Sequence, residues 1–363
     1  MEVTGTLRDV LRVATAARAT DLVFTIDMQP LARVDGTIAP LREFGVVDEQ
    51  AMSDVLHQLL DRTQLATLRR ELDLDFAFSV GQERFRGNVF YQRGCPTVTL
   101  RLIHNRIPSV DEVGLPRAVR ELTRLKQGLV LFCGPTGCGK STTMASLVEA
   151  INQTRACHIL TIEDPIEYLH TNDRAVVHQR EVGFDTSSFT RALRAALRED
   201  PDVVLVGEMR DPESIAITLT LAETGHLVLS SLHTNDAPQT LDRIVDVFPG
   251  VRQPQIRLQL ASTLAAVVAQ RLVPRVNRGL VAAFEVLVGT QAVSNLIREG
   301  KTRQLRNVMQ IARSDGHQTL EMSLNNLVAH GIITRESALA TAFHPQEIEP
   351  EQRAHPRAGS SAS

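Results

Sequence analysis

The chain has 363 residues, enough for about two domains with buried cores. Its 43% hydrophobic and 22% charged residues exclude an intrinsically disordered chain. A net charge of −3, only 4% aromatic residues and the absence of tryptophan argue against a nucleic-acid-binding protein, which would carry a basic surface or stacking side chains.

No stretch reaches the roughly 18 to 20 uninterrupted apolar residues of a membrane span. The nearest, LASTLAAVVAQRLV at 260–273, is interrupted by Ser262, Thr263, Gln270 and Arg271 and predicts a buried helix. The first residues carry charges and no apolar signal core, so we expect a cytoplasmic protein that meets a membrane only through partners. The four cysteines include no C-x-x-C pair and predict neither a zinc site nor a disulfide framework.

The first hundred residues predict a small α/β unit, because apolar residues recur first at helical and then at alternating intervals. In chain order we expect a helix at 7–19, strands at 21–26 and 31–41 with a turn at Asp35–Gly36, a helix at about 48–70, and a hairpin of 72–80 and 83–94 with its turn near Gly81.

The remaining chain has a different pattern. Residues 104–116 carry two prolines and a glycine without any period, which favours a hinge, and beyond them apolar strands alternate with helices as in a parallel sheet. The predicted strands are GLVLFC, HILTIE, DVVLVGE and HLVLSSLHT, with four or five helices at about 253–342. The predicted organisation is therefore a domain at 1–104, a linker at 105–116, a second domain at 117–345 and a disordered tail at 346–363.

Residues 134–141, GPTGCGKS, match the phosphate-loop pattern G-x-x-x-x-G-K-[ST] between a predicted strand and a predicted helix. Its glycines permit close backbone approach, so that consecutive N–H groups and the helix N-terminus face phosphate oxygens. We expect ATP as the ligand, with Lys140 on the β- and γ-phosphates and the Ser141 hydroxyl on Mg²⁺. The expected nucleotide-binding residues are Gly134, Pro135, Thr136, Gly137, Cys138, Gly139, Lys140, Ser141 and Thr142.

Acidic residues follow two of the predicted strands, where ligands bind in open parallel sheets. Glu163 ends HILTIE and Asp164 follows it, with Glu167 nearby, and a carboxylate there could orient or deprotonate the water that attacks the γ-phosphate. Glu208 follows DVVLVG, where a Walker B acid holds Mg²⁺ directly or through water. Helix caps, salt-bridge partners or an exposed strand end are the structural alternatives.

Two histidines, His226 and His233, flank the strand LVLSSL. Their spacing differs from that of a helical zinc site. Each is either structural or a sensor of the γ-phosphate that couples nucleotide state to subunit movement.

Arginines of the first domain are further candidates. Arg84 and Arg86 share one face of the strand predicted at 83–94, and Arg93 and Arg101 follow. They form either a solvated strand face or a group that closes over a triphosphate, within one chain or across a subunit boundary, and stabilises the charge of phosphoryl transfer. The arginines of RALRAALR, at 191, 194 and 198, predict a solvated helix face.

With these motifs in order, the chain resembles the secretion ATPases of type II secretion and type IV pili, above all the PilT-type retraction ATPases. The residues that carry the resemblance are the phosphate loop at 134–143, the aspartate box at 159–168, the Walker B run at 197–214 and the histidine box at 222–249. ATDLVFTI, LARVDGTIAPL, RFRGNVFYQRG and NLIREGKTRQL are similar to further patterns of the family, so the resemblance spans about 5–343.

The resemblance implies an α/β protein with an N-terminal PAS-like domain, then a RecA-like P-loop ATPase domain with a helical C-terminal portion. It implies a ring of six subunits at the cytoplasmic face of the inner membrane, with nucleotide bound between the two domains. ATP hydrolysis would turn the pilus platform protein and remove pilin subunits, which is pilus retraction in twitching motility. A second retraction ATPase is a further candidate partner. Roles carry over by motif position to Lys140, Ser141, Glu163, Glu208, His226 and His233.

Two departures keep alternatives open. Val23 stands where the family usually has histidine, and the histidine box continues TNDAPQT, closer to secretion and assembly ATPases. The chain nevertheless lacks the long N-terminal region and four-cysteine zinc insertion of those relatives, which favours retraction. A pilus assembly or type II secretion ATPase, a nucleotide-gated scaffold with negligible turnover, and a small-molecule phosphotransferase are the other hypotheses.

Overall fold

The computed structural model describes residues 7–17, 19–34, 36–81, 83–103 and 106–350. The chain divides into two compact units, Met1–Arg106 and Ile107–Ser363, each with its own core. Within the ranges just given, no helix combines the length and the apolar character that a membrane crossing requires.

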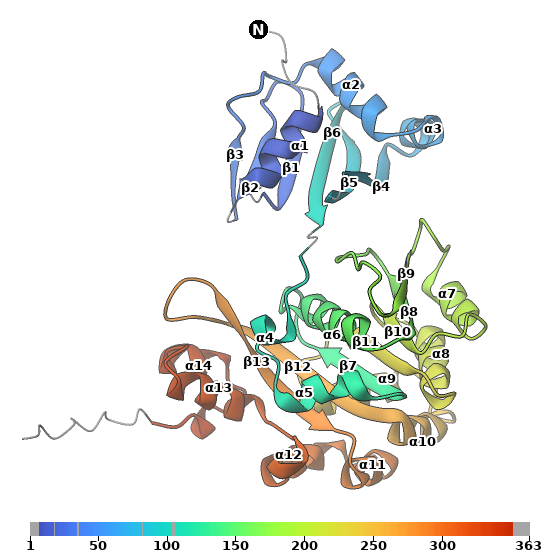
Figure 1. Ribbon diagram of the computed structural model, residues 1–363, viewed down its shortest axis with the longest axis vertical. Coiled ribbons are helices and arrows are strands. Elements are labelled where there is room, and N and C mark those ends of the chain that lie inside the picture. The colour runs from blue at the N-terminus through green and yellow to red at the C-terminus, as the bar shows by residue number, and fades with distance from the viewer. Residues whose placement is uncertain (1–6, 18, 35, 82, 104–105, 351–363) are drawn as a thin grey trace, which may run out of the picture. The chain divides into compact units, whose positions relative to one another are not determined.

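The first unit is a six-stranded antiparallel sheet in the order β3-β2-β1-β6-β5-β4, packed against three helices (Figure 1). Its elements are α1 Leu7–Ala16, β1 Asp21–Phe24, β2 Leu31–Val34, β3 Thr37–Pro40, α2 Glu49–Leu59, α3 Arg62–Glu71, β4 Asp73–Val80, β5 Glu83–Gln92 and β6 Cys95–Ile103. One face of this sheet packs against the helices and the opposite face is polar. The alternation of polar and apolar residues in β4 predicts this arrangement.

The helix predicted at 48–70 is instead two helices. Asp61 caps α3 with its side chain on the Gln64 N–H, and the Gln64 side chain accepts from the Asp61 N–H. This capping box marks the start of α3 and separates it from α2, which ends at Leu59. The β4–β5 hairpin is confirmed, and Gly81 in its turn has a φ of 64°. Of the turn predicted at Asp35–Gly36, Asp35 lies outside the described residues.

A substitution at Gly87 of β5 would test how closely the core of this unit is packed. A Cβ at this position would lie 2.1 Å from the ring of Phe76, which is 1% exposed. We expect Gly87→Ala to lower the free energy of unfolding by about 1 to 3 kcal/mol, as overpacked cores do. Urea denaturation measures the change. The matched control is Gly250→Ala, because a Cβ there meets nothing within 4 Å; equal stability of the two variants would contradict the close packing.

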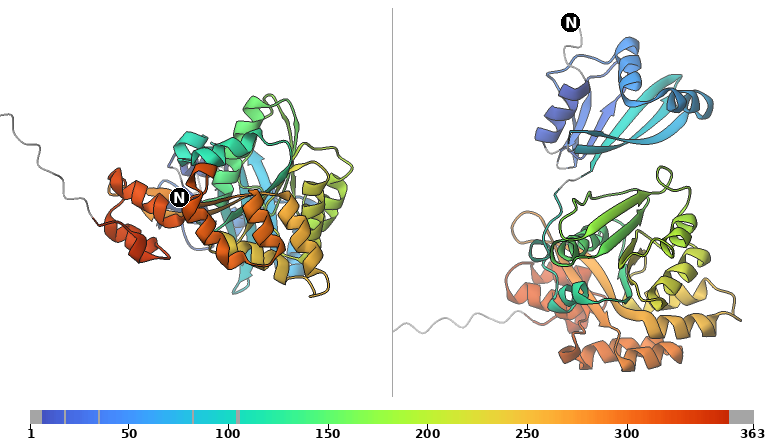
Figure 2. Two further views of the ribbon diagram at one scale, coloured as in Figure 1. Left: turned by 90° about the horizontal axis from the view of Figure 1, so that it is seen from below. Right: turned by 45° about the vertical axis from the view of Figure 1, so that its right-hand side comes forward.

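The second unit is built on a seven-stranded sheet in the order β13-β12-β7-β11-β10-β8-β9, parallel except for β13 (Figures 1 and 2). Its strands are β7 Gly128–Cys133, β8 His158–Glu163, β9 Val176–Glu181, β10 Val203–Val206, β11 Leu227–Leu232, β12 Leu264–Pro274 and β13 Leu280–Val288. The four strands predicted from the sequence are confirmed as β7, β8, β10 and β11.

Helices cover both faces of this sheet. α4 Val110–Val113, α5 Arg117–Glu121 and α6 Lys140–Thr154 pack on one face. The opposite face packs against α7 Phe189–Ala196, α8 Pro212–Glu223, α9 Ala237–Asp246, α10 Gln253–Thr263, α11 Gln291–Arg298 and α12 Leu305–Ile311. The last helices, α13 Leu320–Ala329 and α14 Arg335–Thr341, pack on the outer part of β12 and β13.

The helix predicted at 260–273 is wrong from Leu264 onward. α10 ends at Thr263 and β12 begins at Leu264, pairs in parallel with β7 and continues to Pro274. A run that is apolar on all sides has no period to separate a buried helix from a central strand. The β-branched pair Val267 and Val268 is typical of a strand.

Two segments expected to be irregular are partly folded. α4 and the chain before it pack on α6, where Ser146 Oγ donates to the Pro108 carbonyl at 2.6 Å. Near the other end, a 3₁₀ helix spans Pro345–Glu347, and Ile348 is 4% exposed. Residues 351–363 of the predicted tail lie outside the described residues.

Candidate active site

The phosphate loop joins the carboxyl end of β7 to α6. Gly134, Gly137 and Gly139 have φ angles of 143°, 78° and 91°, a region that side-chain-bearing residues rarely adopt. α6 begins at Lys140, so its first N–H groups face the loop. The Lys140 ammonium is held inside the loop, donating to the carbonyls of Gly134 at 2.8 Å and Pro135 at 3.2 Å.

A buried glutamine of β12 supports the loop from beneath. Gln270 is 3% exposed, and its Oε1 accepts from Thr143 Oγ1 at 2.7 Å. A Cβ on Gly134 would lie 2.5 Å from the Gln270 carbonyl, and a Cβ on Gly139 would lie 2.8 Å from its Nε2. Glycine is therefore required at both positions, where the torsions and the close approach act together. In the sequence Gln270 is visible only as an interruption of an apolar run.

Glu163 ends β8 and is partly buried. Its Oε1 accepts from Thr161 Oγ1 at 2.7 Å and from Gln179 Nε2 at 3.3 Å. Burial raises the pKa of this carboxyl, against the opposing effect of the two donors. A carboxylate held in this way is suited to accept a proton from water.

Glu208 follows β10, which is next to β8 in the sheet. Its carboxylate is 13% exposed, forms an ion pair with Arg210 and lies 3.3 Å from His233 Nε2. His233 follows β11, so that three adjacent strands each deliver a polar side chain to one edge of the sheet.

These residues line one cavity of about 430 Å³. Its lining consists of Thr136, Gly137, Gly139, Lys140, Ser141, Thr142, Met144, Ala145, Glu163, Asp164, Pro165, Glu167, Tyr168, His170, Leu205, Gly207, Glu208, Arg210, Ser231 and His233. The loop residues predicted to bind nucleotide and the predicted acids Glu163, Glu167 and Glu208 thus meet at one place. Gly134, Pro135 and Cys138 lie in the same loop without lining the cavity.

His226 is the predicted histidine that this cavity does not include. It precedes β11, whereas the cavity lies beyond the other end of that six-residue strand, roughly 20 Å away at about 3.3 Å per residue. Its Nδ1 lies 2.9 Å from the Leu221 carbonyl and 3.1 Å from Thr224 Oγ1, at the end of α8. Within its own chain His226 therefore terminates a helix.

The candidate arginines of the first unit lie on or beside β5. Arg84 and Arg86 are partly buried on that strand, and Arg93 is exposed in the turn after it, with a φ of 50°. Arg101 pairs with Asp21 at 2.8 Å. The described residues that line the cavity all belong to the second unit. The arginines at 191, 194 and 198 are exposed, as predicted.

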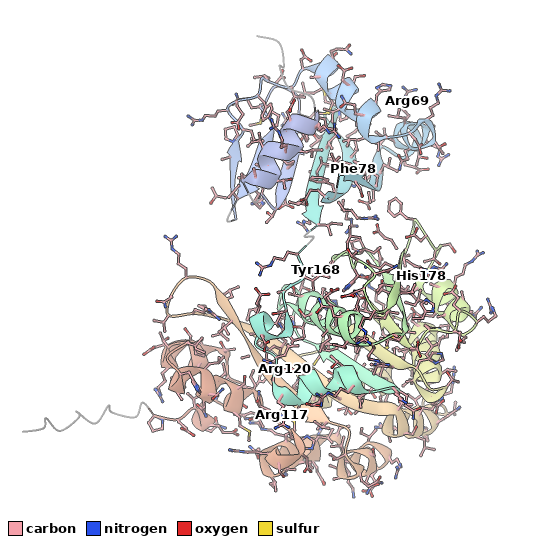
Figure 3. All side chains as sticks on the ribbon, viewed as in Figure 1. Arg69, Phe78, Arg117, Arg120, Tyr168 and His178 are labelled. Carbon is pink, nitrogen blue, oxygen red and sulfur yellow. The ribbon has the colours of Figure 1, made fainter. Side chains whose placement is uncertain are left out.

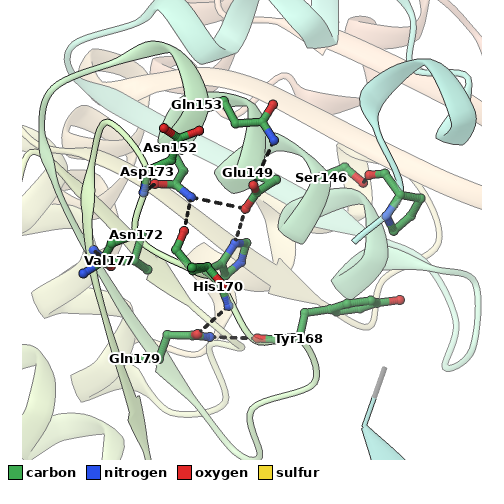
Figure 4. A network of polar contacts seen from close by, with 12 residues as sticks. Ser146, Glu149, Asn152, Gln153, Tyr168, His170, Asn172, Asp173, Val177 and Gln179 are labelled. Atoms are coloured by element: carbon green, nitrogen blue, oxygen red, sulfur yellow. Dashed lines mark hydrogen bonds and ion pairs between the residues drawn. The ribbon is translucent and has the colours of Figure 1, made fainter. Parts of the chain in front are cut away.

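The structure adds a polar network that the sequence did not indicate (Figure 4). Tyr168, beside α6 in Figure 3, shares a hydrogen bond of 2.8 Å with Thr142 Oγ1. His170 Nδ1 lies 2.9 Å from Glu149 Oε2 of α6, and this contact lowers the pKa of Glu149. The irregular segment 164–175, which we call the aspartate-box loop, is therefore attached to the phosphate-loop helix at two points.

Beside this site, a carboxyl group is buried under the histidine box. Glu285 of β13 is 2% exposed and accepts from the Ala237 N–H, at the start of α9, at 2.9 Å. Burial raises its pKa to about 7; the nearby Asp236 and Glu321 act in the same direction and Arg306 opposes them. Because the folded protein holds this proton more tightly than the unfolded chain, stability falls as pH rises from about 4.5 through 7.

Glu285→Gln is expected to remove that loss, since glutamine keeps the acceptor for Ala237 and cannot ionise. The stability of the variant relative to wild type should increase by about 2 kcal/mol between pH 5.5 and pH 8.5. Thermal unfolding at the two pH values measures this difference. If Glu285→Gln changed stability equally at pH 5.5 and pH 8.5, a buried carboxyl that titrates between these values would be contradicted.

A family model for type II/IV secretion system proteins matches residues 58–278. The type IV pilus retraction ATPase PilT of Pseudomonas aeruginosa is 41% identical over 94% of this chain and 99% of its own length. A twitching motility protein of Neisseria gonorrhoeae is 42% identical over 88% of this chain and 86% of its own. A crystal structure of the pilus retraction motor PilT with bound ADP aligns with a TM-score of 0.89 and 44% identity, covering 94% of this chain and 98% of that one.

These matches extend over both units, including the antiparallel sheet of the first and the parallel sheet of the second. The shared region also contains the phosphate loop and the acids at the strand ends. The chain therefore belongs to the family of type II/IV secretion system proteins, among its PilT-like members.

Proposed function

We propose that the protein is an Mg²⁺-dependent ATPase that drives retraction of type IV pili. The observation that carries the proposal is the cavity in which Lys140, Glu163 and Glu208 meet, in a chain that is similar along 94% of its length to a retraction motor whose structure holds ADP. Glu163 would take a proton from, or orient, the attacking water, and Glu167 is a second carboxylate beside it.

The residues present fit a magnesium ion bound together with a triphosphate. No cluster of three histidines, cysteines or acids that could hold a metal occurs among the described residues. Mg²⁺ in phosphoryl-transfer sites instead takes phosphate oxygens, water and one or two protein oxygens. Ser141 would supply a hydroxyl, and Glu208 would act directly or through water; the ion would neutralise charge on the β- and γ-phosphates. His233, beside Glu208, would sense the γ-phosphate.

The charge of the cavity supports a contribution from the first domain. Among the described residues, its lining contains four carboxylates, Glu163, Asp164, Glu167 and Glu208, but only Lys140 and Arg210 as permanent cations. A triphosphate would need further positive charge there. We infer that Arg84, Arg86 or Arg93 supplies it, from the same or a neighbouring subunit, and that the protein acts as a ring of six. His226, remote from the cavity of its own chain, is then available for contacts between subunits.

In this proposal a PAS-like domain at 1–104 and a linker at 105–116 precede a RecA-like ATPase domain at 117–345. The ring would bind the pilus platform protein at the cytoplasmic face of the inner membrane. Its work would remove pilin subunits, and a second retraction ATPase is a candidate partner.

Deletion of the gene in the host tests the direction of work. Retraction predicts that pili accumulate on the surface while twitching stops. Complementation with the wild-type chain should restore twitching, and complementation with a Lys140→Ala variant should not. Loss of surface pili after the deletion would contradict retraction and indicate an assembly ATPase.

A further inference from the structure

Gln179 of β9 links the end of β8 to the aspartate-box loop. Its Nε2 donates to the Tyr168 carbonyl at 2.8 Å and its Oε1 accepts from the His170 N–H at 2.9 Å (Figure 4). The same Nε2 also donates to Glu163 Oε1 at 3.3 Å. The orientation of this amide is determined by its partners. If it were reversed, an NH₂ group would face the His170 N–H and an oxygen would face the Tyr168 carbonyl.

The loop that Gln179 holds is also attached to the phosphate-loop helix. Tyr168 shares its hydroxyl hydrogen bond with Thr142, two residues after Lys140, and His170 contacts Glu149 further along α6. The His170 side chain is only 2% exposed, so this second attachment is shielded from water. Gln179 is thus the point where the sheet, the aspartate-box loop and Glu163 are joined.

The contacts with Glu163 have a direct chemical consequence. Thr161 and Gln179 both donate to Oε1, which fixes the plane of the carboxylate. Donors to an ionised carboxylate also favour its charged form, the form that accepts a proton. Removal of the Gln179 donor would leave Glu163 less well oriented and harder to ionise.

We propose that Gln179 is a positioning residue for ATP hydrolysis: it holds Glu163 and the aspartate-box loop in one geometry relative to the phosphate loop. The inference rests on the proposed function, in which Glu163 acts on the attacking water. Gln179 acts through Glu163 and the loop and does not itself line the cavity.

Two variants separate its contacts. Gln179→Leu removes all three hydrogen bonds, whereas Gln179→Glu keeps the acceptor for His170 and replaces the donor with a charge beside Glu163. We expect kcat about 10- to 100-fold lower in both, as for hydrogen bonds to charged groups, with KM for ATP changed less than about threefold. The acid limb of the kcat–pH profile should move to higher pH, by about one unit or more in Gln179→Glu.

The other groups around Glu163 are the same in both variants, so the shift reports on residue 179. They are Lys140 of α6, Glu208, Arg210 and His233 after the neighbouring strands, Asp164, Glu167 and His170 of the loop, and Glu181 of β9. The matched control is Gln259→Leu, because that amide donates to Glu223 of α8 at 2.7 Å and touches neither Glu163 nor the aspartate-box loop. It should leave both kcat and the acid limb unchanged.

Amide hydrogen exchange is a second measurement that needs no activity. In Gln179→Leu we expect amides of the loop, that of His170 above all, to exchange about tenfold faster than in wild type. If wild type hydrolyses ATP but kcat and the acid limb are unaltered in both variants, the positioning role is wrong. If wild type hydrolyses no ATP, the proposed function fails. In that case, unaltered amide exchange of the loop in Gln179→Leu would separately overturn the claim that Gln179 holds the loop.

Discussion

Replacement of Lys140 by alanine is expected to lower ATP turnover by about 10³-fold and to weaken nucleotide binding by about 10- to 100-fold. In the structure this ammonium lies within the phosphate loop, bound to the carbonyls of Gly134 and Pro135. A triphosphate would draw it toward the β- and γ-oxygens, where charge develops during phosphoryl transfer. Phosphate release and calorimetric titration measure the two effects.

Lys126→Ala is the matched control for that variant. Lys126 is an exposed lysine just before β7, at the opposite end of the strand from the loop. Its replacement should leave turnover and binding unchanged. Undiminished turnover in folded Lys140→Ala protein would reject the assignment of this loop as the phosphate site.

Replacement of Glu163 by glutamine should separate chemistry from binding. The amide keeps an acceptor for the Thr161 hydroxyl but cannot take a proton from water, so kcat should fall by about 10²- to 10⁴-fold. Affinity for Mg²⁺–ATP should be retained or increased, because the variant removes one of the four carboxylates of the cavity. Rapid-quench kinetics and calorimetry measure kcat and affinity on the same material.

The pH profile and a surface control complete that test. Because burial raises the pKa of Glu163, wild-type turnover should decline as the pH falls through the pKa of this carboxyl. The residual activity of Glu163→Gln should not show that decline. Glu223→Gln, at the exposed end of α8, should behave as wild type. A normal kcat in Glu163→Gln would exclude this carboxylate as the proton acceptor.

The parts of the site that the sequence predicted are those encoded locally. The phosphate loop needs its glycines, lysine and serine within eight residues, between a buried strand and a helix start, and these neighbours were readable. Glu163 and Glu208 were placed together because acids at the ends of parallel strands share one edge of a sheet. Both inferences needed only the type and direction of short elements.

The parts that were missed depend on contacts across the chain. Gln179 lies on β9, an edge strand too polar to show an apolar pattern, and its three partners lie 9 to 16 residues earlier, in the end of β8 and the irregular loop, where no local pattern predicts the contacts. Gln270 reaches Thr143 from a strand that the sequence alone favours as a helix. His226 precedes β11 and His233 follows it, so the two histidines of one motif lie at opposite ends of the strand, and His233 alone of the two lines the cavity.

The most direct test of the nucleotide site is calorimetric titration of the intact, folded protein with ADP and with ATP in excess Mg²⁺. The site described above predicts saturable binding of one nucleotide per chain, strongly reduced by Lys140→Ala and preserved in Glu163→Gln. Failure of the wild-type protein to bind either nucleotide would contradict the assignment of the cavity and, with it, the proposed motor.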